Sequence, residues 1–222
     1  MKNFLVILML MPTLSFSDDK KIYDQAYDRL LKNDNKGAIE LFLKIPDNID
    51  AQYYLYTLFY DEKDLEKAHY WLKLCSNNGD PYCQNDLGYF YDNGIYVSEN
   101  KKKAYDLFLK SAEQGSSNAY TTIASYYLDG DVVNQSYSKA FEYYKKGAEA
   151  EFGNTERALY GLALMYEKGL GTKADYEKAK QLYLEAYDLG HKVSLNRINA
   201  LEGNASYALD LAEKYKTGSD IS

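Results

Sequence analysis

The stretch that decides the fold is ALYGLALMYEKGLGTKADYEKAKQLYLEAYDLG, residues 158–190. Its first half places Ala158, Leu162 and Tyr166 four residues apart, which puts them on one face of a helix. Gly169 then interrupts the pattern with a residue that tolerates a positive φ. A second apolar face follows after the glycine-bearing loop. The stretch therefore predicts two helices joined by a short loop.

The same unit recurs along the chain. The dipeptide Lys-Ala, which lies in the second helix of each unit, occurs at 67–68, 103–104, 139–140 and 178–179, spacings of 36, 36 and 39 residues. The first helix starts with a small residue at Cys83, Ala119 and Ala158. An earlier copy starts at Ala51 and lacks four loop residues. One such helix pair cannot bury its apolar face alone, so neighbouring pairs must stack.

We predict an all-α fold, an α/α superhelix (solenoid) of stacked helix-turn-helix repeats. A single domain at 18–217 would hold strong copies at 49–79, 80–115, 116–151 and 154–190, degenerate copies at about 20–45 and 191–217, and a tail at 218–222. A small residue follows the leucine-like anchor of three first helices. These residues, Gly88, Ala124 and Ala163, should lie where two helices nearly touch.

The pattern resembles the Sel-one-like repeat (SLR) family, a relative of tetratricopeptide repeats. The family pattern, roughly A-x3-LG-x2-Y-x2-G-x-G-V-x2-D-x2-KA-x2-WY-x-KAA-x2-G, matches well in three copies and best at residues 158–190. The copy that starts at Ala51 has the shorter loop of a tetratricopeptide repeat. The resemblance covers about residues 49–190 strongly and the ends weakly. It implies the geometry of the stack and says much less about function.

The first residues have the order of a signal for export. Lys2 precedes an apolar run at residues 4–11, and the small residues Ser15 and Ser17 are spaced as before a signal-peptidase site. That order is typical of a secretory signal peptide, here residues 1–17. The run is too short to cross a bilayer, which takes about 20 residues. We expect a periplasmic or secreted protein with no integral membrane segment after the signal is removed.

Composition narrows the class of partner. The formal net charge is −7, and the Lys and Arg residues form no basic stripe along the sequence. Nucleic-acid binding needs clustered Lys and Arg to neutralise phosphates, so we expect no nucleic-acid partner. Tyrosine is the unusual residue, with 25 copies against one Trp. We expect a monomer without a cofactor that binds a protein or peptide.

The only two cysteines, Cys75 and Cys83, flank the joint formed by Gly79, Asp80 and Pro81. Stacked helices bring such positions together, and secreted cysteine-rich members of the similar family carry pairs at this spacing. A disulfide in an exported chain is the favoured interpretation, and two buried free thiols are the alternative. No metal site is expected, because no nearby histidine completes a tetrahedral set.

Catalytic residues are not expected. The only histidines, His69 and His191, have no serine or cysteine partner in a recognisable frame. Some members of the similar family have been described as penicillin-binding or β-lactamase-like, and pieces of that signature occur here at Ser98-x-x-Lys101, Ser136-x-x-Lys139 and Lys216-Thr217-Gly218. Both serines precede second helices, where they can instead act as N-caps. A β-lactam-binding protein or weak β-lactamase is the alternative function.

By analogy with tetratricopeptide repeats, the first helices should line a concave groove that binds the partner. Counting from the leucine-like anchors gives the candidates Tyr53, Thr57, Tyr82, Asn85, Tyr89, Asn118, Thr121, Ser125, Arg157, Tyr160 and Leu164. Tyrosine offers a large contact area at low entropy cost, although these rings could merely cover core edges. The predicted function is an exported interaction module, an adaptor or scaffold. One version is an immunity protein that neutralises a secreted toxin.

Overall fold

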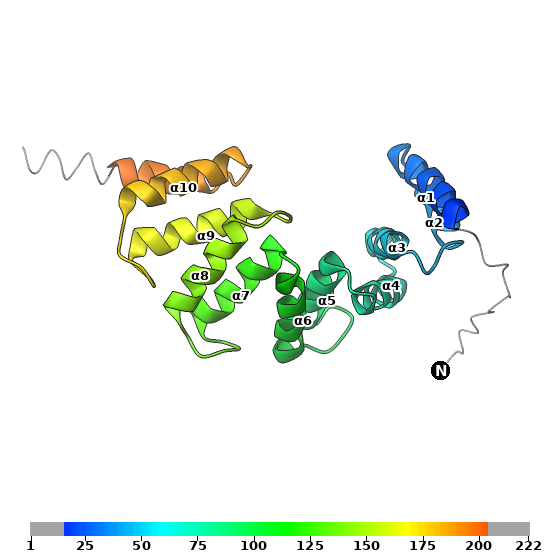
Figure 1. Ribbon diagram of the computed structural model, residues 1–222, viewed down its shortest axis with the longest axis horizontal. Helices are drawn as coiled ribbons and strands as arrows, with labels where there is room; N and C mark the ends of the chain where they lie inside the picture. Colours follow the sequence, from blue (N-terminus) through cyan, green and yellow to red (C-terminus); the bar gives the residue numbers. More distant parts are fainter. Residues whose placement is uncertain (1–15, 204–222) are drawn as a thin grey trace, which may run out of the picture. The chain divides into compact units, whose positions relative to one another are not determined.

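The computed structural model describes residues 16–203, and its regular elements there are α-helices (Figure 1). They are α1 Phe16–Leu31, α2 Asn35–Phe42, α3 Ile49–Asp61, α4 Leu65–Asn77, α5 Pro81–Asn93, α6 Lys101–Glu113, α7 Ser117–Asp129, α8 Tyr137–Ala148, α9 Thr155–Lys168 and α10 Tyr176–Asp188. A further helical stretch begins at residue 194 and reaches the end of the described range. The predicted all-α fold of stacked helix pairs is confirmed.

Parts of the predicted ends lie outside the described residues. These are most of the signal peptide at 1–17, the last part of the degenerate copy at 191–217, and the tail at 218–222. Helix α1 begins at Phe16, just before the predicted cleavage point. None of the described helices is both long enough and apolar enough to span a membrane.

Short polar side chains start most of the helices. In eight of them the side chain just before the helix accepts a backbone N–H three residues on; these are Asp34, Asn48, Asp64, Asp80, Asn100, Ser116, Ser136 and Asp175. Each cap satisfies a donor that the helix leaves without an internal partner. The predicted cap at Ser136 is confirmed. The one at Ser98 is wrong, because Asn100 caps α6 through Lys103 N–H at 2.9 Å.

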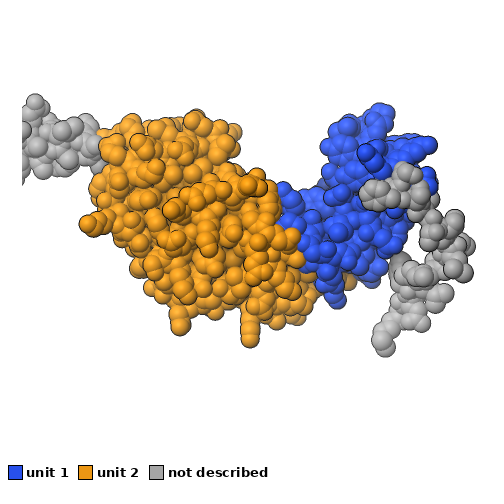
Figure 2. Space-filling view, in the orientation of Figure 1, with its two compact units in different colours: residues 1–83 blue, residues 84–222 orange. Residues whose placement is uncertain are grey.

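The chain forms two compact units, residues 1–83 and 84–222 (Figure 2), and the predicted single domain stays a prediction. In the first unit, α1 packs on α2, α2 on α3 and α3 on α4. Small and large apolar residues alternate in its core, which includes Ala26, Ala38, Phe42, Ala51, Leu55, Phe59, Ala68 and Leu72. Each alanine lets the facing helix approach while the larger side chains fill the space beside it.

In the second unit the helices from α6 to α10 pack in succession, and α7 also contacts α9. First helices of successive repeats therefore lie side by side, as repeat stacking requires. One core cluster lies on α6 and α7 and includes Ala104, Phe108, Ile123 and Tyr126. A second cluster, on α7 to α10, includes Ala124, Tyr144, Leu162, Met165 and Tyr183.

The predicted close approaches between helices are confirmed. Ala124 and Ala163 are fully buried, and a Cβ added at Gly88 would lie 2.8 Å from Cε1 of Phe108. The sequence prediction missed Gly161, where an added Cβ would lie still closer to the ring of Tyr144. Helix backbones approach at these positions because no larger side chain separates them.

Replacing Ala124 with leucine should lower the free energy of unfolding by about 1–3 kcal/mol, because the added atoms have no space. Chemical denaturation followed by circular dichroism measures the loss. Ala200→Leu is the control, since Ala200 is exposed in the last described helical stretch. A variant at position 124 as stable as the control would show that the repeat alignment is wrong.

Candidate protein-binding site

The joint between α4 and α5 is covalently closed. The sulfurs of Cys75 and Cys83 are 1.97 Å apart, and the Cα atoms of the pair are 5.8 Å apart. Both residues are fully buried. Asp80 Oδ1 accepts the backbone N–H of Cys83 at 2.7 Å, so this carboxylate caps α5. The end of α4 is thereby tied to the first turn of α5, which carries Tyr82.

The Asp80 carboxylate also lies near both sulfurs, with the three ligand atoms within 4.8 Å of one another. Burial raises the pKa of Asp80, and the nearby charge of Asp50 raises it further. The bonded sulfurs offer no thiolate, and thiolate is the form of cysteine that binds metals. The arrangement is therefore that of a capped and cross-linked joint.

Replacing both cysteines with alanine should lower the free energy of unfolding by about 2 kcal/mol, because the unfolded chain loses a constraint on a short loop. The helices should remain, since apolar stacking runs through every repeat. A reductant should destabilise the original protein by the same amount and leave the double variant unchanged. Mass spectrometry of unreduced peptides should find Cys75 linked to Cys83, and two free thiols would contradict the prediction.

In the first unit the predicted contact residues include a pair of tyrosines. The ring of Tyr53 on α3 lies 6.2 Å, centroid to centroid, from that of Tyr82 on α5. Tyr82 is 42% exposed. Thr57 is half-buried, and its hydroxyl donates to the carbonyl of Tyr54 at 2.9 Å. The two tyrosines are therefore better placed for contact than the threonine.

Three further tyrosines extend this pair, and the sequence prediction missed them. Tyr54 lies 5.8 Å from Tyr53, and both Tyr23 and Tyr27 of α1 lie near Tyr54, at 6.2 and 5.9 Å. We call these five residues, Tyr23, Tyr27, Tyr53, Tyr54 and Tyr82, the tyrosine surface. The α1 residues lie in the degenerate first copy, which offers no anchor to count from. The presence of tyrosines in residues 20–45 was the one feature of the sequence that could have pointed to these α1 residues.

The second unit begins with the remaining part of α5. Tyr89 is 52% exposed and follows Tyr82 by two helical turns on the same helix. Asn85 lies between them and donates to Asp86 Oδ1 at 3.2 Å. One face of α5 thus presents two large, exposed aromatic side chains.

On α7 the predicted residues mostly have internal roles. Thr121 is only 9% exposed, so it offers little surface to a partner. Gly147 of α8 has no side chain to hold the two helices apart, and a Cβ added there would lie 3.4 Å from Thr121 Oγ1. The Ser125 hydroxyl lies 3.1 Å from that of Tyr144, and Asn118 Oδ1 accepts the Asn154 N–H at 3.0 Å.

The predicted residues on α9 differ in their surroundings. Arg157 is exposed. The half-buried ring of Tyr160 lies 4.4 Å from the His191 ring and 5.4 Å from the Tyr183 ring. Leu164 packs against the core cluster of α7 to α10. Tyr160 and Leu164 therefore cover a core edge, which the alternative interpretation of the sequence held for the tyrosines.

In the described range, the Ser136-x-x-Lys139 piece of the β-lactamase signature serves helix α8. The Ser136 hydroxyl caps α8 at Lys139 N–H, and Lys139 Nζ lies 4.9 Å from the centroid of the Tyr127 ring. Lys216-Thr217-Gly218 falls outside the described residues. The described geometry gives the β-lactam alternative no specific support.

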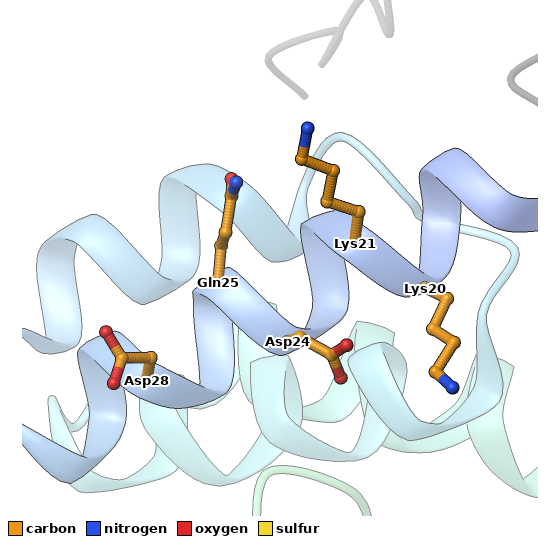
Figure 3. Close-up of a pocket in the computed structure, with 5 residues that line it drawn as sticks. All are labelled: Lys20, Lys21, Asp24, Gln25 and Asp28. Carbon is orange, nitrogen blue, oxygen red and sulfur yellow. The ribbon is translucent and has the colours of Figure 1, made fainter.

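Two surface depressions are present in the described part of the chain. One lies on α1, where the side chains of Lys20, Lys21, Asp24, Gln25 and Asp28 stand out from a single helix (Figure 3). The other lies beside the start of α7 and the end of α8, and it includes Gln114, Tyr120, Lys146 and Phe152. Both are open and carry mixed polar groups, so extended aromatic surfaces remain the stronger candidates for binding.

Solved structures include several similar chains. A Sel1 repeat protein from Oxalobacter formigenes is 25% identical over 79% of this chain and 73% of its own, with a TM-score of 0.72. A protective antigen of uropathogenic Escherichia coli with an SLR fold is 20% identical over 83% of this chain and 41% of its own, at a TM-score of 0.71. Yeast Tom70 is 15% identical over 92% of this chain and 44% of its own, with a TM-score of 0.62. The last two likenesses show the fold alone.

No match was found among curated protein sequences. The family model of the Sel1 repeat matches residues 49–80, 81–116, 118–152 and 156–191. These ranges begin and end within two residues of the four strong copies predicted from the sequence. Repeats of this kind form protein-binding modules. Because the matches cover more than half of the chain, the protein belongs to the Sel1 repeat family.

Proposed function

We propose that this protein is an exported adaptor or scaffold that acts as a monomer and binds a protein or peptide through tyrosines of its first helices. The observation that carries the proposal is the face of α5, where Tyr82 and Tyr89 are 42% and 52% exposed. Exposed aromatic rings on a rigid helix suit a protein interface, where such residues supply much of the binding energy.

Export is supported by two features. Residues 1–17 have the order of a secretory signal peptide, and the Cys75–Cys83 disulfide is of a kind that persists in oxidising compartments. A periplasmic or secreted location follows from these features within the proposal. An immunity protein is a narrower version, which requires that the partner be a toxin and that binding neutralise it.

The binding site can be tested by photo-crosslinking. A photoreactive phenylalanine analogue at position 89 should cross-link a specific protein from an envelope extract. The same analogue at position 102 is the matched control, because Lys102 is exposed on the second helix α6. Cross-linking at 102 and none at 89 would place binding on the second helices. Turnover of a chromogenic β-lactam by the purified chain would favour the enzymatic alternative.

A further inference from the structure

Two carboxylates, Asp50 and Asp80, lie close in the chain to residues of the tyrosine surface. Asp50 is exposed in the first turn of α3. Burial, the neighbouring Tyr54 and then the charge of Asp50 raise the pKa of Tyr23, and Asp50 also acts on Asp80. On α3, Asp50 precedes Tyr53 and Tyr54 by three and four residues, about one helical turn, so it lies on the same side of the helix as these rings.

The five rings form a continuous aromatic surface drawn from three helices. Tyr23 and Tyr27 are stacked, with an interplanar angle of 8° and centroids 6.4 Å apart. From Tyr27 the contacts continue through Tyr54 and Tyr53 to Tyr82, with neighbouring centroids 5.8–6.2 Å apart. The two ends remain open to solvent, since Tyr27 is 41% and Tyr82 42% exposed.

Aromatic faces are electron-rich and attract the cations of Lys and Arg, more so when carboxylates lie nearby. The chain uses this contact within its own fold. Lys103 Nζ lies 4.0 Å from the centroid of the Tyr91 ring, and Lys63 Nζ lies 5.5 Å from that of Tyr60. Two tyrosines outside the tyrosine surface, Tyr60 on α3 and Tyr91 on α5, thus already hold ammonium groups at the distances that the interaction requires.

We infer that the tyrosine surface, with Asp50 and Asp80 beside it, binds a basic segment of a protein partner. The aliphatic stems of Lys or Arg would cover the rings, and their charged groups would approach the carboxylates. The net charge of −7 also favours the approach of a basic partner. This inference rests on the proposed function and names the chemistry of the partner.

A labelled decapeptide of alternating Arg and Gly, followed by fluorescence anisotropy with the full chain, tests the inference. The peptide should bind, and a decapeptide of alternating Glu and Gly should not. Raising the salt from about 25 to about 250 mM should weaken binding several-fold, because charge attraction is screened. Tyr27→Ala combined with Tyr82→Ala should weaken binding about tenfold or more, and Asp50→Asn about threefold.

Two matched variants serve as controls. Tyr70→Ala removes a tyrosine that is 55% exposed on α4, and Asp61→Asn removes an exposed carboxylate at the other end of α3 from Asp50. Neither should change the affinity for the basic peptide. Circular dichroism should show that all variants keep their helices, so that lost binding reports on the surface.

Several results would overturn the inference. The acidic peptide could bind as tightly as the basic one, or the Tyr27/Tyr82 variant could bind the basic peptide with unchanged affinity. The two control variants could also lose as much affinity for the basic peptide as the test variants do. Binding of chitotetraose at the same tyrosines without peptide binding would assign the surface to a sugar instead. If position 89 cross-links a protein but the basic peptide does not bind, this inference fails and the proposed function stands.

Discussion

Replacing Phe108 with alanine is expected to lower the free energy of unfolding by about 3–5 kcal/mol. The Phe108 side chain is 2% exposed. Its ring lies against Gly88 of α5 and 6.0 Å from the ring of Tyr126 on α7. Truncation would leave a cavity among three helices, and close-packed helices collapse only partly around such a space. Chemical denaturation followed by circular dichroism measures the loss.

The control is Tyr176→Ala, which removes an aromatic ring that is 61% exposed on α10 and should change stability by no more than about 0.5 kcal/mol. Gly88→Ala tests the contact itself, because the added Cβ would lie 2.8 Å from Cε1 of Phe108. Gly88→Ala should therefore lower the free energy of unfolding when Phe108 is present. It should have little effect on that free energy in the Phe108→Ala background. Independent effects of the two substitutions would contradict the predicted contact.

The architecture could be predicted because the repeat specifies each helix locally. The spacing of the repeat identified the small residue at Gly88. Helices α7 and α9 end at Gly130 and Gly169, which adopt the left-handed conformation that glycine tolerates. Gly161 was missed for a physical reason. It lies against Tyr144 of α8, the second helix of the preceding repeat. A pattern read within one repeat does not specify contacts with its neighbour.

The candidate site was less predictable, because exposure depends on how closely the neighbouring helix packs. Counting from anchors placed Tyr82 and Tyr89 on the surface, where they lie. The same counting also selected Thr121, which is buried because Gly147 brings α8 close to α7 there. Tyr23 and Tyr27 were missed because residues 20–45 match the repeat too weakly to align. Tyr23 and Tyr27 join the tyrosine surface through their ring contacts with Tyr54 of α3, and these contacts depend on helix packing that the sequence pattern does not specify.

The double variant Tyr82→Ala with Tyr89→Ala is expected to weaken partner binding by more than about 2 kcal/mol, roughly 30-fold in affinity. A captured partner provides the ligand, and calorimetry or surface binding measures the change. Both rings project from one preformed helix, so little ordering entropy of the backbone opposes their contact. Neither residue is buried, and the helical circular dichroism should therefore persist.

Substitutions of exposed charged residues on the second helices are the matched comparison for the Tyr82/Tyr89 double variant. Lys102, Glu142 and Lys145 are exposed on the second helices α6 and α8. Changing them to alanine should alter binding by less than about 1 kcal/mol, because rim charges contribute little to affinity. If those changes abolish binding while the tyrosine variant keeps it, the partner binds the second helices. The exposed rings of α5 would then have another role, and the proposed site would be wrong.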